Sequence, residues 1–119
     1  MPDITPDVRA AVASVLSHVY YQHPAQLAVF PCAVLYESAN AEAARADGSA
    51  HLHEIEDTLE LWAQTPGETH ALSAAADAQL SALGLMRAAC TDLYDAPAAA
   101  HRRVLRYRAL CDENGVLTQ

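Results

Sequence analysis

Apolar and polar residues alternate with a period of two in the stretch from residue 54 to residue 61. The apolar positions are Ile55, Leu59 and Leu61, and the polar positions between them are Glu54, Glu56, Thr58 and Glu60. This period is typical of a β-strand with one buried face and one solvated face. The sequence therefore predicts a one-sided strand that ends near Gln64.

The pattern changes at Thr65, where the sequence predicts the start of a helix. Thr65 is a residue type that caps helices, Pro66 suits the first helical position, and Glu68 stands three residues after the cap. Apolar residues then follow at helical spacing until Gly84, namely Leu72, Ala75, Ala76, Leu80 and Leu83. A one-sided strand that leads directly into a one-sided helix indicates a sheet covered by helices on one face.

The remaining periodic segments predict one more helix and three more strands. A helix is expected to begin at a Thr5 cap and to carry an apolar stripe as far as Val19. Strands are expected at Phe30–Ser38, Leu85–Leu93 and His101–Leu110. The strand at Phe30–Ser38 is apolar on both faces, so it is expected to be central or covered on both sides.

Together these elements predict an α+β fold. We expect a mostly antiparallel four-stranded sheet with two helices packed on one face, in a single domain over residues 1–110. The polar, alanine-rich segment Ala39–Ala50 contains the turn signal Asp47-Gly48 and is too long for a tight hairpin. We expect a long loop there, with an extended hairpin arm as the alternative, and a C-terminal tail over residues 111–119.

Composition and charge exclude several classes of function. The chain has 119 residues and a net charge of −8, and all of its basic residues are arginines. Such a chain is a poor candidate for general binding to nucleic acid or to an anionic membrane. The three cysteines are odd in number and far apart in the sequence, and no secretory signal opens the chain, which indicates a reducing compartment such as the cytoplasm.

Candidate catalytic and metal-binding residues are few. His51 and His53 have a spacing that can bind zinc or copper, but a metal site needs a third ligand, and the sequence does not single one out. Glu54, Glu56 and Glu60 could act as paired carboxylates, but on a solvated strand face their pKa values would not be strongly tuned. We therefore predict no catalytic residue, no bound metal and no cofactor.

The carboxylates of this strand and the arginines of the last strand are complementary in charge. These faces could pair within one sheet or between neighbouring copies of the chain. Trp62 is either an exposed interface residue or a lid over the rim of the core. The predicted subunit-interface residues are Arg45, Asp47, Glu54, Glu56, Glu60, Trp62, Arg102, Arg106 and Arg108.

The order of elements and several local phrases resemble a known family. The phrases are Val19-Tyr20-Tyr21, the proline-containing strand at 30–37, Glu54 to Trp62, Thr65-Pro66, Leu83-Gly84, Asp92 to Asp95 and His101 to Arg108. From about Thr5 to Leu110, the chain resembles the tail-completion or tail-terminator (head–tail joining) proteins of long-tailed bacteriophages. The chain is unusually rich in alanine and free of lysine for such a protein.

The resemblance implies a structural role in the virion, with no enzymatic activity. Such proteins form a ring, usually six-fold, at the head-proximal end of the tail, where they stop tail-tube assembly and join the tail to the head. The implied partners are copies of the chain itself, the tail-tube protein and a head-completion or connector protein. DNA would pass through the ring without sequence-specific binding, no membrane would be involved, and assembly would take place in the host cytoplasm. The alternatives are a head–tail connector stopper or adaptor, and a small metal-binding protein that uses His51 and His53.

Overall fold

The computed structural model describes residues 3–21, 29–46 and 50–117, with the side chains of residues 43–46 and 50–51 excepted. This part of the chain folds into two helices and a six-stranded sheet. The helices are α1 (Thr5–Ala13) and α2 (Pro66–Ala82). The strands are β1 (Val19–Tyr20), β2 (Cys32–Ala46), β3 (Ala50–Ala63), β4 (Met86–Asp95), β5 (Ala100–Asp112) and β6 (Gly115–Val116).

The sheet is mixed. Its strand order is β1-β2-β3-β5-β4, and β6 pairs with the end of β5. β1 runs parallel to β2, and all the other pairs are antiparallel. The α+β class is confirmed, but the predicted four-stranded antiparallel sheet is wrong, because β1 and β6 add two short strands and a parallel pair. Each of these strands has two residues, which is too few to show any periodicity.

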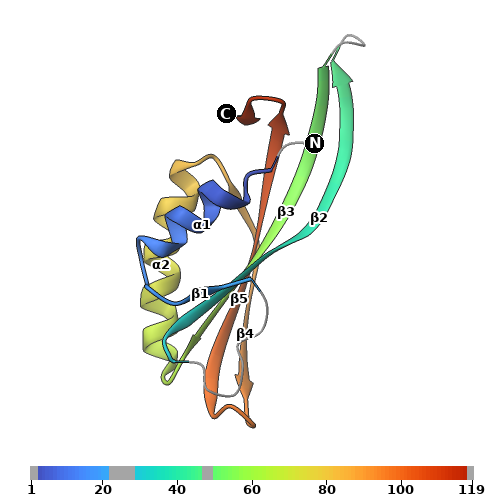
Figure 1. The fold of residues 1–119 in the computed structure, drawn as a ribbon. Helices are drawn as coiled ribbons and strands as arrows, with labels where there is room; N and C mark the ends of the chain where they lie inside the picture. Colours follow the sequence, from blue (N-terminus) through green and yellow to red (C-terminus); the bar gives the residue numbers. More distant parts are fainter. Residues whose placement is uncertain (1–2, 22–28, 47–49, 118–119) are drawn as a thin grey trace.

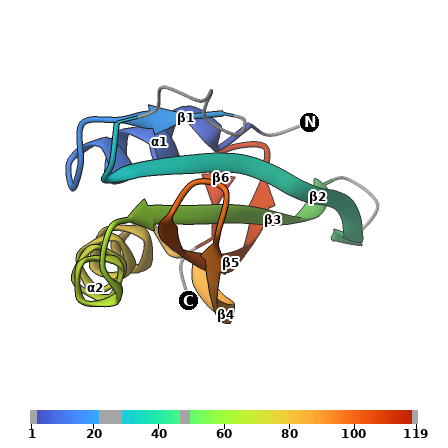
Figure 2. The same ribbon diagram turned by 90° about the horizontal axis from the view of Figure 1, so that it is seen from below.

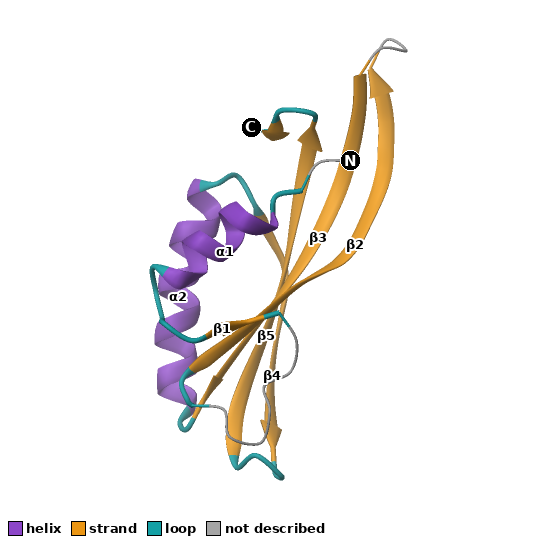
Figure 3. Cartoon of the chain, in the orientation of Figure 1, coloured by secondary structure: helices purple, strands orange, loops and turns teal. Residues whose placement is uncertain are grey.

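Both helices pack on the same face of the sheet, as predicted (Figures 1 and 3). The core between the layers contains Val8 and Val12 of α1, Leu80 of α2, and strand residues that include Leu59 and Leu105. The Tyr107 hydroxyl of β5 also donates a hydrogen bond to Asp77 Oδ1 of α2 at 2.7 Å. Burial of these apolar side chains holds the helices against the sheet.

A smaller apolar cluster covers part of the opposite face of the sheet. It contains Cys32, Val34, Trp62 and Ala100, and the Phe30 ring stacks on Trp62 with 6.3 Å between ring centroids. Cys32 and Val34 therefore face this cluster, whereas Ala33 and Leu35 face the helices. This confirms that the first long strand is covered on both sides, at its N-terminal end.

β2 and β3 form a long two-stranded arm, so the loop expected at Ala39–Ala50 is wrong and the alternative, an extended hairpin arm, is confirmed. The ladder runs from the Cys32–Trp62 pair to the Ala46–Ala50 pair. In Figures 1 and 2 these strands extend together beyond the rest of the sheet, in a molecule of 51 × 24 × 22 Å. Two register shifts in β2, at 37/39 and 42/44, interrupt its alternation and hide the strand from periodicity. The predicted turn at Asp47-Gly48 lies outside the described residues.

The first helix is shorter than predicted, because it ends at Ala13 and Val19 belongs to β1. Thr5 is also not the capping residue: Ile4 occupies the N-cap position, and the Thr5 amide donates to Asp3 Oδ1 at 3.0 Å. The segment after the helix still packs on the core through Val15 and Leu16. β-branched valines are weak helix formers, so this segment can leave the helix and keep its apolar contacts.

The second helix begins and ends as its sequence predicts. The Thr65 hydroxyl accepts a hydrogen bond from the Glu68 amide at 3.2 Å, and Pro66 is the first helical residue. After the helix, Gly84 has a φ of 94°, a conformation that favours glycine. Beyond Leu110, where a tail was expected, β5 continues to Asp112 and pairs with β6.

Candidate functional site

The acidic and basic rows that the sequence suggested lie side by side on the helix-free face of the sheet. β3 pairs with β5, so Glu56 lies opposite Arg108, Thr58 opposite Arg106, and Trp62 opposite Arg102. The pairing of the two faces within one sheet, one of the two predicted arrangements, is therefore confirmed. This pairing determines which of the charged side chains contact their own chain and which stay exposed to other molecules.

Glu60 is the buried centre of this face. Its side chain accepts hydrogen bonds from the Tyr36 hydroxyl and from Trp62 Nε1, each at 3.2 Å, and from Arg102 at 3.4 Å. The Arg102 guanidinium also lies over the Trp62 ring, 5.0 Å from its centroid. Burial, and then the charge of Glu60, raise the pKa of Tyr36. This cluster ties β2, β3 and β5 together.

The burial of this cluster corrects two expectations about exposure. Glu60 is only 3% exposed, so the expectation of a solvated carboxylate is wrong at this position. Trp62 is 4% exposed and packs as a lid over the second apolar cluster, so it is not an exposed tryptophan. In the isolated subunit both residues contact their own chain, and a role between subunits stays a prediction.

The remaining predicted interface residues lie toward the arm or outside the described part. Glu54 and Arg108 form an ion pair at 3.8 Å with both side chains more than half exposed, and Arg106 is also exposed. Glu56 is half-buried and accepts a hydrogen bond from the Ser38 hydroxyl at 3.0 Å. Arg45 lies in the arm, where its backbone pairs with that of His51, and its side chain is not among those described. Asp47 lies outside the described residues. Their roles in an interface stay predictions.

One buried carboxylate was missed by the sequence reasoning. Asp57 is 3% exposed, lies on the helix-facing side of β3, and neither of its oxygens has a hydrogen-bond partner among the described residues. Burial, and then the charges of Glu37 and Asp3, raise the pKa of Asp57 from 3.8 to about 6. Its position among the apolar residues of the period-two pattern was the signal that could have found it.

A second missed feature is the outer strand β4. All of its residues are exposed except the half-buried Asp95, on both faces of the strand. Met86, Leu93 and Tyr94 are 62%, 42% and 60% exposed. Cys90 is also exposed, whereas Cys32 and Cys111 are buried.

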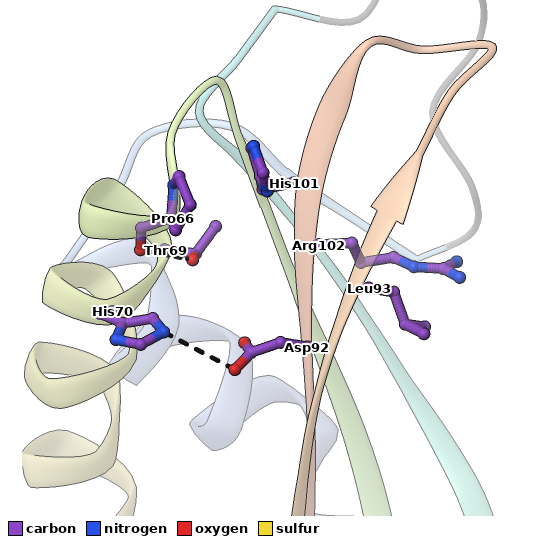
Figure 4. A pocket seen from close by; sticks show the side chains of 7 residues that line it. All are labelled: Pro66, Thr69, His70, Asp92, Leu93, His101 and Arg102. Carbon is purple, nitrogen blue, oxygen red and sulfur yellow. Dashed lines mark hydrogen bonds and ion pairs between the residues drawn. The ribbon is translucent and has the colours of Figure 1, made fainter.

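A surface hollow beside β4 holds few groups that could do chemistry. Figure 4 shows its lining, which includes His70 of α2 and Asp92 of β4, with 3.6 Å between His70 Nε2 and Asp92 Oδ2. Both side chains are more than half exposed, and Arg103 reaches the same carboxylate at 3.4 Å. Exposed ion pairs of this kind contribute about 0–1 kcal/mol, so their effect is to connect α2 with β4.

The alternative function, a small metal-binding protein, relied on His51 and His53. His53 lies half-buried on β3, and the side chain of His51 is not among those described. Within the described ranges, no group of three or more His, Cys, Asp or Glu side chains is arranged to hold a metal ion. Neither described helix is both long enough and apolar enough to cross a lipid bilayer.

Comparison with known proteins identifies the family. The sequence model of the tail completion protein gp17 family matches residues 5–112. A chain from the solved virion of a native gene transfer agent (GTA) particle has a similar fold, with a TM-score of 0.56 and 16% sequence identity. The match covers 88% of this chain and 91% of that chain. No curated protein matches the sequence. The chain belongs to the tail completion protein gp17 family, and its place in a virion is therefore the tail, as the resemblance implied.

Proposed function

We propose that the chain is a non-enzymatic structural subunit of a ring at the head-proximal end of a phage or phage-like tail. The ring ends assembly of the tail tube and joins the tail to the head. The observation that carries this proposal, beyond family membership, is the arm of β2 and β3, which extends past the helices (Figure 1). A projecting arm of this kind is suited to contact other subunits.

The distribution of charge supports a ring. A closed ring needs two different surfaces on each subunit that fit each other by rotation. The half of the sheet formed by β2 and β3 is rich in carboxylates, whereas β5 carries the exposed arginines Arg106 and Arg108. The other two arginines of β5 are paired with Glu60 and Asp92 of the same chain. One subunit therefore offers an acidic side and a basic side, as a head-to-tail contact requires.

The proposed partners follow from the position in the tail. They are further copies of the chain, in a six-fold ring, the tail-tube protein below and a head-completion or connector protein above. DNA passes through the ring, and the net charge of −8 favours passage without sequence-specific binding. A head–tail connector stopper is the second candidate, because it would use the same two sides.

Deletion of the gene from a phage that encodes the chain tests the proposal. We expect tails of uncontrolled length and heads that remain unjoined, and we expect the intact gene supplied in trans to restore normal particles. Normal-length tails together with filled heads that lose their DNA would favour the stopper. Normal particles without the chain would contradict both candidates.

A further inference from the structure

The sheet has two backbone edges that no described strand fully covers. β4 is the last strand on one side, and among the described residues it pairs only with β5. On the other side β1 pairs with β2 only at Ala33 and Val34. The rest of the β2 edge, residues 35–46, has no described strand beside it. Such edges present backbone N–H and C=O groups to which another strand can pair.

The β4 edge has few of the features that usually prevent pairing. Soluble proteins protect edge strands with lysine, with proline, with β-bulges or by covering them. β4 has ten residues, contains neither lysine nor proline, and is exposed over nearly its whole length; its register shift, at 87/89, lies close to one end and leaves residues 90–95 in regular pairing. It also carries Met86, Leu93 and Tyr94, which are among the most exposed large apolar side chains of the described chain. A strand of this composition is suited to become an interior strand in an assembly.

We propose that β4 of one subunit pairs with the free part of β2 in the next subunit, so that the sheets of the ring form one continuous sheet. This inference rests on the proposed function, and it names the surface that closes the ring. The partner is a second copy of the chain, because the chain itself carries two free edges of similar length. Each subunit then gives one edge and receives one edge, which is the heterologous contact of a closed ring.

Strand direction is consistent with this pairing. β2 and β5 run in one direction, and β3 and β4 run in the opposite direction, since each neighbouring pair is antiparallel. In a ring whose axis lies roughly along the strands, rotation preserves these directions. β4 of one copy therefore meets β2 of the next copy antiparallel, the arrangement with the more stable hydrogen bonds.

The position of β1 sets an offset between the copies. Cys90 at the centre of β4 is level with Leu105, Leu59 and Leu35, because these residues are paired across the sheet. β1 already pairs with β2 at the residues just before Leu35. A strand added to the free part of β2 must therefore be centred near Asn40, which pairs with Ile55.

β4 of the added copy is then displaced along the strand direction, relative to β4 of the first copy, by about four to five residues, or roughly 15 Å at about 3.3 Å per residue. Over the width of the four long strands, roughly 19 Å, this is a tilt of about 40°, within the usual range for closed sheets.

Charge also disfavours one of the like-edge contacts. The exposed carboxylates Glu37 and Glu42 lie on the helix-facing side of β2, and the exposed Arg87 lies on the same side of β4. Joining two β2 edges would bring the carboxylates together, and like charges across a sheet are destabilising. Joining β4 to β2 places Arg87 on the same face as these carboxylates, whereas Asp92 of β4 is already paired with Arg103 of its own chain.

Hydrogen exchange of the full-length wild-type chain tests the pairing without any substitution. Amide exchange is measured by mass spectrometry at low concentration, where the chain is monomeric, and again in the assembled ring. We expect exchange in assembled rings to slow at least about tenfold in peptides from residues 86–95 and from residues 35–46. Slowing in residues 86–95 alone would indicate a two-fold β4–β4 contact and would overturn the pairing. Slowing confined to the helices would overturn it as well.

Proline substitutions supply a second test. Neighbouring residues of an antiparallel strand direct their N–H groups to opposite sides, so Cys90→Pro and Thr91→Pro remove one donor to β5 and one donor from the free edge. Loss of the donor to β5 should disrupt the fold, whereas loss of the donor at the free edge should not. The proline variant that still folds as a monomer is therefore the one that has lost the free-edge donor, and we expect it not to form rings. Thr91→Ala keeps the backbone donor and should assemble as the wild type does. A folded proline variant that still forms rings would overturn the pairing.

Failure of this inference differs from failure of the proposed function. If wild-type rings form but their protected amides lie elsewhere, only the strand pairing is wrong. If the wild-type chain stays monomeric and is absent from purified particles, the ring itself is wrong, and the pairing falls with it.

Discussion

At the scale of single residues, the helix-free face depends on Glu60. This carboxylate is almost fully buried, and its hydrogen bonds come from three side chains on three different strands. A buried charge is tolerated when its partners compensate for lost solvation, and removing one partner leaves the others unpaired. Glu60 therefore stabilises the subunit itself, before any contact with another molecule.

We expect Glu60→Gln to lower the free energy of unfolding by about 1–3 kcal/mol, because Arg102 loses its charged partner while the shape of the side chain is kept. Urea denaturation followed by circular dichroism measures the change. The control is Glu54→Gln, which removes an exposed pair and should change stability by less than about 0.5 kcal/mol. Equal effects of the two substitutions would show that the buried cluster has no special role.

Asp57 should make stability depend on pH in a direction opposite to that of most carboxylates. Its pKa in the folded state, about 6, lies above the ordinary value of 3.8, so the folded chain binds the proton more tightly than the unfolded chain. The stability that protonated Asp57 provides is present below pH 4 and is lost as pH rises from about 4 to about 6. Glu37, Asp3 and Cys111 are the titratable groups close enough to influence it.

We therefore expect Asp57→Asn to be more stable than the wild type above pH 6, by about 1–2 kcal/mol, and the advantage to shrink toward pH 4. Urea denaturation of both proteins at several pH values between 4 and 8 gives the difference. Glu113→Gln, which removes an exposed carboxylate in a turn, is the matched control and is measured at the same pH values. A constant difference for Asp57→Asn would mean that the buried carboxyl does not titrate in this range.

Strand β3, which carries Glu60, shows what residue patterns can predict. Alternation correctly placed Ile55, Leu59 and Leu61 on the helix-facing side. It could not predict that Glu60, on the polar side, is buried, because that burial comes from Tyr36 and Arg102 on other strands. Contacts between residues distant in sequence decide burial, and a one-dimensional period does not contain them.

At the scale of elements, α2 was predicted well because its signals are local. Its cap, its first-turn proline and its closing glycine all lie within the helix or next to it. The arm was predicted only as the alternative to a loop, because a ladder between backbones needs no apolar period, and its register shifts disturb the pattern that remains. Short strands such as β1 depend wholly on a partner strand that lies elsewhere in the sequence.

The cap of α2 gives a prediction at this scale. We expect Thr65→Ala to lower the free energy of unfolding by about 1 kcal/mol, because the Glu68 amide loses its acceptor. Chemical denaturation measures the loss. The control is Ser81→Ala in the last turn of the same helix, at an exposed position, where alanine should be neutral or slightly stabilising. An unchanged stability for Thr65→Ala would show that water replaces the cap without cost.

At the scale of the whole molecule, the proposed ring gives the exposed charges of the sheet a testable role in assembly. Arg106 is exposed, and in the proposed ring it lies one strand away from the β2 edge of the next copy. We expect Arg106→Glu to fold normally, because it is a surface change, but to raise the concentration at which rings form by about fivefold or more. Analytical ultracentrifugation measures this concentration, and particle complementation measures its consequence.

The matched control is Arg9→Glu, which makes the same change in net charge on α1, in the helix layer, where the arginine lies over the Tyr21 ring. If both variants weaken assembly equally, net charge alone is responsible. If Arg106→Glu assembles as the wild type does at low ionic strength, the arginine row does not contribute to contacts between subunits. A defect of Arg106→Glu that fades as salt is added, with Arg9→Glu unaffected, is the result expected if opposite charges on neighbouring copies select the head-to-tail contact.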